Sequence, residues 1–91
     1  HLLEVALQPD TDVVLEKGSN LVLSCQASGC PQPEFSWKNL ANMPILRQIK
    51  TDGFQSQLFF YLVELKDEGT YLCEVTCGSI KKSKQTNLKV F

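Results

Sequence analysis

The chain has 91 residues, and nine lysines and arginines against ten aspartates and glutamates leave a formal net charge of -1. This balance argues against nucleic acid or an anionic membrane surface as the partner. The longest apolar run, from Leu58 to Val63, is far below the roughly 18 residues that span a bilayer. No signal-type segment opens the chain, so we expect residues 1–91 to be a single mature domain excised from a larger ectodomain.

The cysteines indicate how so small a domain is stabilised. A chain of this size buries only about two-thirds of the surface that it exposes when unfolded, so its core alone gives marginal stability. Four cysteines in such a short chain are typical of a disulfide-stabilised extracellular domain. We therefore expect oxidised cysteines and an extracellular location, as part of a plasma-membrane protein.

Short strands joined by turns are predicted from the N-terminus onward. Residues 3–7 alternate between apolar leucine or valine and other residues, and a second short strand is expected at residues 13–15. The turn at residues 16–19 contains a glycine that accepts positive φ. The clearest period of two covers residues 21–27, which predicts a half-buried strand with Cys25 facing inward.

The second half of the chain continues this pattern. Phe35 and Trp37 share one face of a strand that follows a proline-containing approach, because proline is tolerated before a strand but not in its middle. The alternation of Leu58, Phe60 and Leu62 predicts a strand with these three residues inward. Two further strands are expected at residues 70–76 and 81–90, with a polar turn at residues 66–69.

One set of residues indicates the fold. Cys25, Trp37 twelve residues later and Cys73 supply inward anchors for two facing sheets, and Tyr71 lies two residues before Cys73. This combination resembles the disulfide, core tryptophan and tyrosine corner of immunoglobulin sandwiches. The sequence therefore predicts an all-β, immunoglobulin-like (I-set type) two-sheet Greek-key sandwich with two disulfides.

Four cysteines permit three pairings, of which only Cys25 with Cys73 places a bridge between the sheets beside Trp37. Cys30 and Cys77 then form the second bridge, which joins two loops at one end of the sandwich and stiffens that tip for binding. The alternative use of the thiols is a zinc site. The alternating strand around Cys25 and the lack of a ββα pattern argue against it.

Finer motifs carry a closer resemblance, which extends over nearly the whole chain. The chain resembles the first domain of the vascular, intercellular and mucosal addressin cell adhesion molecules, and most of all the vascular type. The spacing from Cys25 to Cys30 and from Cys73 to Cys77 is specific to this group. The motif of residues 67–73, in contrast, is common to many immunoglobulin-type domains. The matching motifs are Leu23-Ser24-Cys25, the gap to Cys30, Phe35-Ser36-Trp37, Pro44-Ile45, Gly53, and Tyr71-Leu72-Cys73 followed by Cys77.

The resemblance also implies where a partner binds. In that family the segment after the tryptophan strand exposes an acidic residue that binds an integrin through the integrin's own divalent cation. The corresponding segment here is residues 39–46, and Asn42 takes the acidic position. A neutral amide oxygen is a poor ligand for a hard cation, and neither Glu34 nor Asp52 falls on the matching position. The resemblance thus implies an adhesion setting, and Asn42 marks the departure from integrin binding.

The same segment, residues 39–46, is unusually apolar. Exposed apolar loops on a rigid scaffold often mark partner sites, and we expect this one to be supported by the tip that Cys30 and Cys77 pin. The alternative is that two or three of its four large apolar side chains, including Leu46, fold back onto the core. The predicted partner-binding residues are Leu40, Asn42, Met43, Pro44 and Ile45.

A second candidate surface lies on the predicted strand of residues 58–62. Phe59 and Tyr61 alternate with its inward residues and should project outward, near Val22 on the neighbouring strand. Such a patch suits packing against another domain or chain, including self-association. The alternatives are a register break that buries one of the aromatics, or cover by a neighbouring domain.

The remaining charged features have simpler explanations. The lysines at residues 81–84 suit an acidic partner or a sulfated glycan, but lysines on an edge strand more often prevent edge pairing. Asp67 is expected to pair with a base such as Arg47 or Lys50.

Catalysis is not expected. The only histidine is His1, oxidised cysteines cannot act as nucleophiles, and no phosphate-binding loop or metal-ligand cluster occurs. No catalytic residue, metal or cofactor is therefore predicted. The predicted function is an extracellular protein-binding module of a cell-surface adhesion receptor. The alternatives are a ligand-binding or dimerisation domain of a cytokine- or growth-factor-type receptor, and a structural spacer domain.

Overall fold

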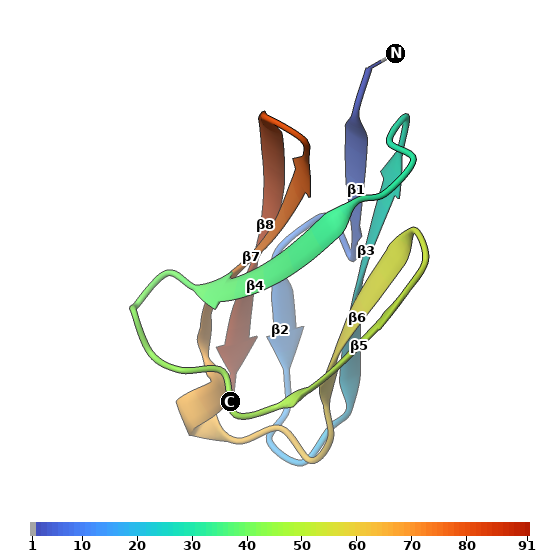
Figure 1. The fold of residues 1–91 in the computed structure, drawn as a ribbon. Coiled ribbons are helices and arrows are strands. Elements are labelled where there is room, and N and C mark those ends of the chain that lie inside the picture. Colours follow the sequence, from blue (N-terminus) through green and yellow to red (C-terminus); the bar gives the residue numbers. More distant parts are fainter. Residues whose placement is uncertain (1) are drawn as a thin grey trace.

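The computed structural model describes residues 2–91, and His1 lies outside the described residues. Two four-stranded sheets pack face to face, with strand orders β1-β3-β6-β5 and β2-β8-β7-β4 (Figure 1). This arrangement confirms the predicted immunoglobulin-like sandwich. The strands are β1 (Glu4–Gln8), β2 (Val13–Leu15), β3 (Leu21–Ser28), β4 (Glu34–Asn39), β5 (Gln48–Asp52), β6 (Gln55–Phe60), β7 (Gly69–Cys77) and β8 (Ile80–Val90), and a 3-10 turn, η1, covers Leu65–Asp67.

The period of two in the sequence becomes the inner face of each sheet. In β3, Leu23 and Cys25 are fully buried while Val22 and Gln26 are exposed. The register places Leu23 opposite Leu58 of β6 and Cys25 opposite Leu7 of β1, so apolar residues of neighbouring strands share one face. This inner face packs against the second sheet, where Val75 and Leu88 are buried.

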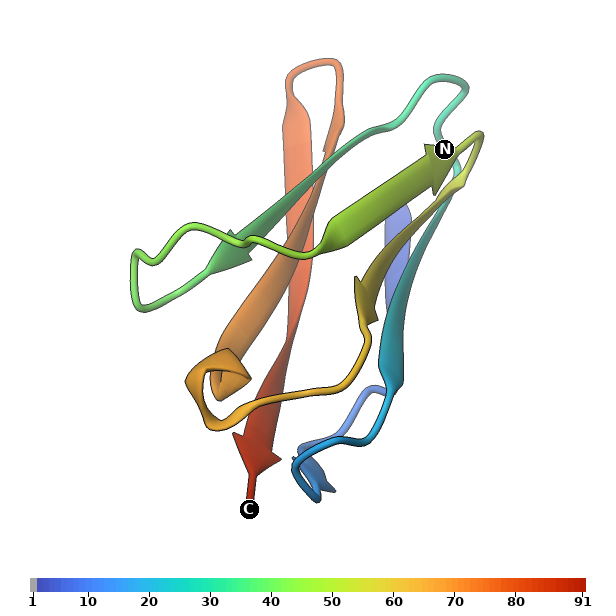
Figure 2. The same ribbon diagram turned by 90° about the horizontal axis from the view of Figure 1, so that it is seen from below.

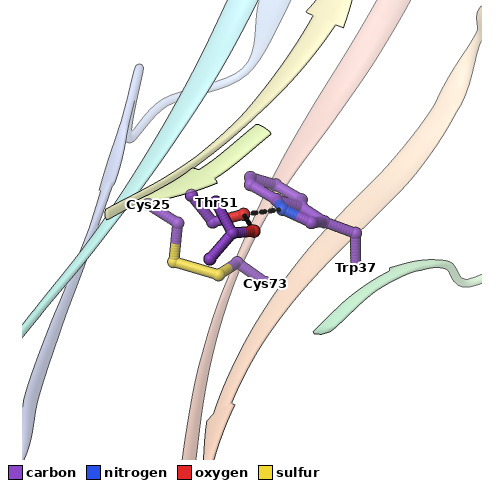
Figure 3. Close-up of a disulfide and its surroundings, with 5 residues drawn as sticks. Cys25, Trp37, Thr51 and Cys73 are labelled. Atoms are coloured by element: carbon purple, nitrogen blue, oxygen red, sulfur yellow. Dashed lines mark hydrogen bonds between the residues drawn. A yellow bond between two sulfur atoms is a disulfide. The ribbon is translucent and has the colours of Figure 1, made fainter. Parts of the chain in front are cut away.

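The inter-sheet bridge and the tryptophan lie at the centre of the sandwich. Cys25 and Cys73 form a disulfide, as predicted, and neither cysteine is exposed to solvent. The Trp37 indole nitrogen donates a hydrogen bond to the buried Ser56 hydroxyl at 2.8 Å, and Thr51 bonds the same hydroxyl at 2.9 Å (Figure 3). Trp37 is only half-buried, because β4 is the outer strand of its sheet and leaves one side of the ring open.

Replacing Ser56 by alanine should therefore destabilise the domain through the tryptophan. Ser56→Ala leaves the Trp37 N–H without its acceptor inside the sandwich, which costs about 1–2 kcal/mol. Urea unfolding followed by tryptophan fluorescence measures this loss. Ser83→Ala, at an exposed position of β8, is the matched control and should change stability by less than about 0.5 kcal/mol.

One prediction for β6 is wrong. Leu62 was expected to face inward, but β6 ends at Phe60 and the Leu62 side chain is 55% exposed. Leu62 adopts a φ of 55°, and its N–H donates to the Asn20 side chain at 2.9 Å. This left-handed residue breaks the alternation and turns Val63 into the core, where it is fully buried.

The second bridge joins Cys30 to Cys77, also as predicted, but its position corrects one expectation. β4 begins with Glu34 opposite Thr76, next to this bridge, and ends with Asn39 opposite Tyr71. Its five residue steps span about 17 Å. The loop after β4 thus lies at the far end of the strand from the Cys30–Cys77 tip, and the bridge does not support it (Figure 1).

Candidate protein-binding site in the loop between β4 and β5

The loop of residues 40–47 leaves β4 through a tight turn that Asn39 organises. The Asn39 side-chain oxygen accepts the N–H of Ala41 at 3.0 Å, and its backbone oxygen accepts the N–H of Asn42 at 2.9 Å. The Leu40 N–H donates to Thr70 of β7 at 2.9 Å, which ties the turn to the neighbouring strand. Asn42 has a φ of 60°, a conformation that asparagine tolerates better than most residues. The start of the loop is therefore well defined.

The apolar side chains of the loop mostly face solvent. Leu40, Met43 and Leu46 are 49%, 62% and 87% exposed, and Pro44 is exposed as well. Only Ile45 is half-buried and packs against the core. Of the two expectations for this loop, outward apolar residues describe it better than a loop folded back onto the core. Figure 2 shows the segment projecting beyond both sheets.

These side chains border a shallow depression. Its lining includes the half-buried Trp37 and Ile45 and the exposed Leu40, Asn42 and Met43. Ile49 of β5, which is 43% exposed, also lines it. The depression brings together all five residues predicted from the sequence and adds Trp37, Lys38, Asn39 and Ile49.

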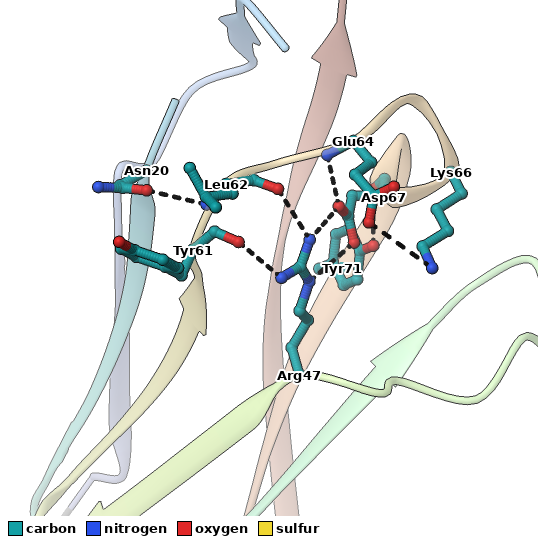
Figure 4. A network of polar contacts seen from close by, with 8 residues as sticks. All are labelled: Asn20, Arg47, Tyr61, Leu62, Glu64, Lys66, Asp67 and Tyr71. Atoms are coloured by element: carbon teal, nitrogen blue, oxygen red, sulfur yellow. Dashed lines mark hydrogen bonds and ion pairs between the residues drawn. The ribbon is translucent and has the colours of Figure 1, made fainter. Parts of the chain in front are cut away.

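Arg47 anchors the other end of the loop. Its guanidinium donates to both carboxylate oxygens of Asp67, with Nε to Oδ1 at 3.0 Å, and to the backbone oxygen of Tyr61 at 2.8 Å (Figure 4). Asp67 also accepts the N–H of Glu64 at 2.8 Å, and its backbone oxygen accepts the Tyr71 hydroxyl at 2.6 Å. The predicted pairing of Asp67 with Arg47 is confirmed, and Lys50 takes no part in the ion pairs found in residues 2–91.

Burial and pairing act in opposite directions on the groups of this network. Burial raises the pKa of the Asp67 carboxyl, but the hydrogen bonds from Arg47 and from the Glu64 N–H outweigh it and leave this pKa below its usual range. The hydrogen bond to Asp67 raises the pKa of Arg47, against the effect of burial. Burial, followed by the charge of Asp67, raises the pKa of Tyr71. The network therefore favours a charged ion pair at neutral pH.

The candidate site itself carries little charge. Residues 39–46 contain no acidic or basic residue, and Lys38, which also lines the depression, pairs with Glu74 at 3.7 Å. Among residues 2–91, no group of three or more His, Cys, Asp or Glu side chains gathers as a metal would require. The surface can therefore act through apolar contact and shape, and Asn42 can add hydrogen bonds.

The second candidate surface is open as well. Val22 and Tyr61 are 39% and 68% exposed, and Phe59 is half-buried. The register places Phe59 between Val22 of β3 and Gln48 of β5, which cover part of its ring. Phe59 and Tyr61 both stay outside the core, so the end of β6 at Phe60 leaves this surface intact.

The lysines of β8 border a different region, the open corner between β8 and β1. Lys82 lies opposite the inward residue Val75, yet it is exposed. The edge of β8 is unpaired at this end, because β2 pairs with β8 only at Leu88–Val90. Lys81, Lys82 and Lys84 line a shallow depression beside Glu4 and Val5. Lysines on such an unpaired edge protect it from pairing with other strands.

Two contributors to the loop site were missed at the sequence level. Ile49 sits in a strand in which every residue is exposed, so no alternation separates an inner from an outer face. Lys38 follows Trp37 in a strand that is not fully covered on either face. The structure reveals this position through the register, because Ile49 lies opposite the inward residue Leu58 and lines the same depression as Trp37.

The fold, the two disulfides and the Tyr71 corner define an immunoglobulin-type domain. The family model of the immunoglobulin I-set domain matches residues 4–90, and the chain belongs to this family. Among solved structures, it is similar to a chimeric titin Z1Z2 (TM-score 0.78, 24% identity, covering 100% of this chain and 98% of that one). It is similar also to the M1 domain of titin (TM-score 0.79, 17% identity, covering 99% and 95%).

Curated relatives include adhesion proteins. Vascular cell adhesion protein 1 of Rattus norvegicus is 34% identical over 87 residues, which cover 96% of this chain and 12% of the rat protein. Hemicentin-1 of Mus musculus is 36% identical over 91 residues, covering 94% and 2%. Contactin-1 of Bos taurus is 35% identical over 80 residues, covering 87% and 8%. The chain thus spans a small part of the length of each relative. No helix within residues 2–91 is long and apolar enough to cross a membrane.

Proposed function

We propose that this domain is an extracellular protein-binding module of a cell-surface adhesion receptor, and that the loop of residues 40–47 carries the binding surface. The observation that carries the proposal is the outward projection of Leu40, Met43 and Leu46 from a loop fixed at both ends. Large apolar side chains kept in water by a rigid loop lose little conformational freedom on binding. The similarity to vascular cell adhesion protein 1 supports the adhesion setting and a place within a longer protein.

The loop can be tested by removing its apolar side chains. Cells that adhere to the immobilised unmodified chain should adhere at least tenfold less to the immobilised Leu40→Ser/Met43→Ser variant. Both residues are largely exposed, so thermal unfolding should stay within a few degrees of the unmodified chain. The matched control is Val14→Ser, which removes a 62% exposed apolar residue elsewhere. Unchanged adhesion to the folded double variant, or an equal loss with Val14→Ser, would count against the loop.

The partner class can be tested through Asn42. If the surface descends from one that offers a carboxylate to a partner's cation, adhesion of the natural chain should resist chelation of divalent cations, because the Asn42 amide contributes little to such an ion. Asn42→Asp should then add a component of adhesion that EDTA removes. Asn42→Gln, which keeps the neutral amide, is the control. If EDTA changes adhesion to the unmodified chain, Asn42→Asp and Asn42→Gln by the same factor, residue 42 does not contact a partner's cation and recognition is not of the integrin type.

The outer face of the sheet β1-β3-β6-β5, including Val22, Phe59 and Tyr61, is a second candidate surface. Its exposure favours it, since two of these apolar side chains meet solvent on one sheet face. We propose that it contacts protein, either another domain or a second copy of the chain.

A further inference from the structure

The outer face of the sheet β1-β3-β6-β5 is nearly free of charge. On the central strands β3 and β6 its outward residues are serine, glutamine, valine and phenylalanine, and none is ionisable. Its charged residues, Glu4, Lys50 and Asp52, lie on the edge strands β1 and β5. The central outward residues are Val22, Ser24, Gln26, Ser28, Gln55, Gln57 and Phe59.

This neutrality is not a general property of the domain. The outer face of the other sheet carries Glu74 in the middle of β7, which pairs with β4 on one side and β8 on the other, and it also carries Lys81 and Lys89 on β8. A charge-free centre within a charged rim is the composition expected of a protein interface. A charged partner would find no complement on the neutral face.

We infer that the neutral face associates with the same face of a second copy of this chain, about a two-fold axis that runs parallel to the strands between β3 and β6. Such an axis keeps each residue at its height along the strand and exchanges β3 with β6. Because Val22, Ser24 and Gln26 lie opposite Phe59, Gln57 and Gln55, each then faces that residue of the other copy. Valine meets phenylalanine, and amides meet amides or hydroxyls.

The register selects this axis over the alternative. A two-fold axis perpendicular to the strands, placed at the height of Ser24 and Gln57 so that the two faces still overlap, would reverse the rows. It would place Val22 over Gln26 and Phe59 over Gln55 of the other copy. The two apolar positions would then meet polar groups. Side-chain amides donate and accept hydrogen bonds, so a face rich in glutamine is complementary to itself, and no like charges oppose each other at its centre.

The size of the face sets the strength of the contact. Four strands about 4.8 Å apart and five residues long cover on the order of 300 Å² in projection. This is below the roughly 800 Å² per partner of a standard stable interface. The association is therefore transient, and several domains held side by side at a cell surface would strengthen it through effective concentration. This inference deepens the second surface proposed above and is independent of the loop between β4 and β5.

Concentration-dependent NMR of the unmodified chain tests the inference directly. Raising the concentration from about 0.05 mM to about 1 mM should slow translational diffusion and shift the amide signals of β3 and β6, while those of residues 40–47 stay in place. Signals that do not change over this range, or that change mainly on β7 and β8, would overturn the proposal. Neither outcome bears on adhesion through the loop, which Leu40→Ser/Met43→Ser tests separately.

Charge exchange tests the predicted axis. Gln57→Glu and Ser24→Lys should each reduce the concentration-dependent shifts at least fivefold, because each brings buried charge against a neutral group of the other copy. An equimolar mixture of the two variants should restore association, since the axis places residue 24 over residue 57. Gln85→Glu and Ser83→Lys, on the outer face of the other sheet, are the controls and should leave association intact. Failure of the folded mixture to recover would rule out this axis.

Discussion

Replacing Cys25 and Cys73 together by alanine is expected to cost about 4–5 kcal/mol, the largest loss of any change considered. With the second disulfide in place, the bridge closes a ring of only about ten residues, because Cys30 and Cys77 lie five and four residues from its ends. The chain-entropy relation gives about 3 kcal/mol for such a ring. The remainder comes from packing, since both sulfur atoms lie in the fully buried centre and their removal leaves a small cavity.

The matched variant is Cys30→Ala/Cys77→Ala. It opens a ring of the same size, but Cys77 is only half-buried, so the loss should be about 2–3 kcal/mol. Chemical unfolding of both variants and the unmodified chain measures the difference. Equal losses would show that ring closure alone determines the effect and that packing around the central bridge adds nothing.

Replacing Arg47 by methionine is expected to cost about 2–4 kcal/mol. The change leaves the Asp67 carboxylate, whose side chain is only 9% exposed, without its counter-ion and removes a donor from the Tyr61 oxygen. Because Arg47 closes the loop of residues 40–47, amide hydrogen exchange in that loop should also accelerate. The Arg47→Met/Asp67→Asn double variant should lose less than the sum of the single variants, since the unpaired charge is gone. Strict additivity would indicate that the two groups do not interact.

The ion pair of Arg47 with Asp67 predicts how the stability of the fold depends on acid. The pKa of Asp67 is lower in the folded domain than the ordinary value of 3.8 for an aspartate, so the unfolded chain binds a proton more readily. The stabilisation from this group is complete well above pH 3.8 and is lost as the pH falls through the folded value. Urea unfolding between pH 6 and pH 2 should therefore show a steeper loss for the unmodified chain than for Asp67→Asn. Parallel curves would assign the acid sensitivity to other carboxyl groups.

The features that the sequence predicted well rest on local periodicity and on a few fixed spacings. The alternation in β3 predicted the inner face directly. The sequence spacings from Cys25 to Trp37, Tyr71 and Cys73 predicted the sandwich and, with the two remaining cysteines, both bridges. These signals are strong because burial on one sheet face and a bridge between sheets leave few choices of register.

The features that were missed depend on contacts between segments far apart in the chain. Leu62 continues the alternation of β6 in the sequence, but the strand ends early. The N–H groups of Leu62 and Val63 instead donate to the Asn20 side chain and to the Ser19 backbone oxygen, in the turn before β3. The position of the loop likewise follows from the direction of β4 and not from its composition. Cys30 precedes β4 and residues 40–47 follow it, and the pairing of β4 with β7 places Cys77 at the beginning of β4, away from the loop.

Photo-cross-linking from the loop is the most direct test that residues 40–47 contact a partner on cells. A benzophenone side chain in place of Met43, which is 62% exposed, should label a membrane protein on adherent cells after illumination. Excess unmodified chain should suppress the labelling, and excess Leu40→Ser/Met43→Ser should not. The same probe in place of Ser83, on the outer face of the sheet β2-β8-β7-β4, should give no labelling that excess unmodified chain suppresses. Competed labelling from position 83 and none from position 43, in cells that still adhere, would place the binding surface elsewhere.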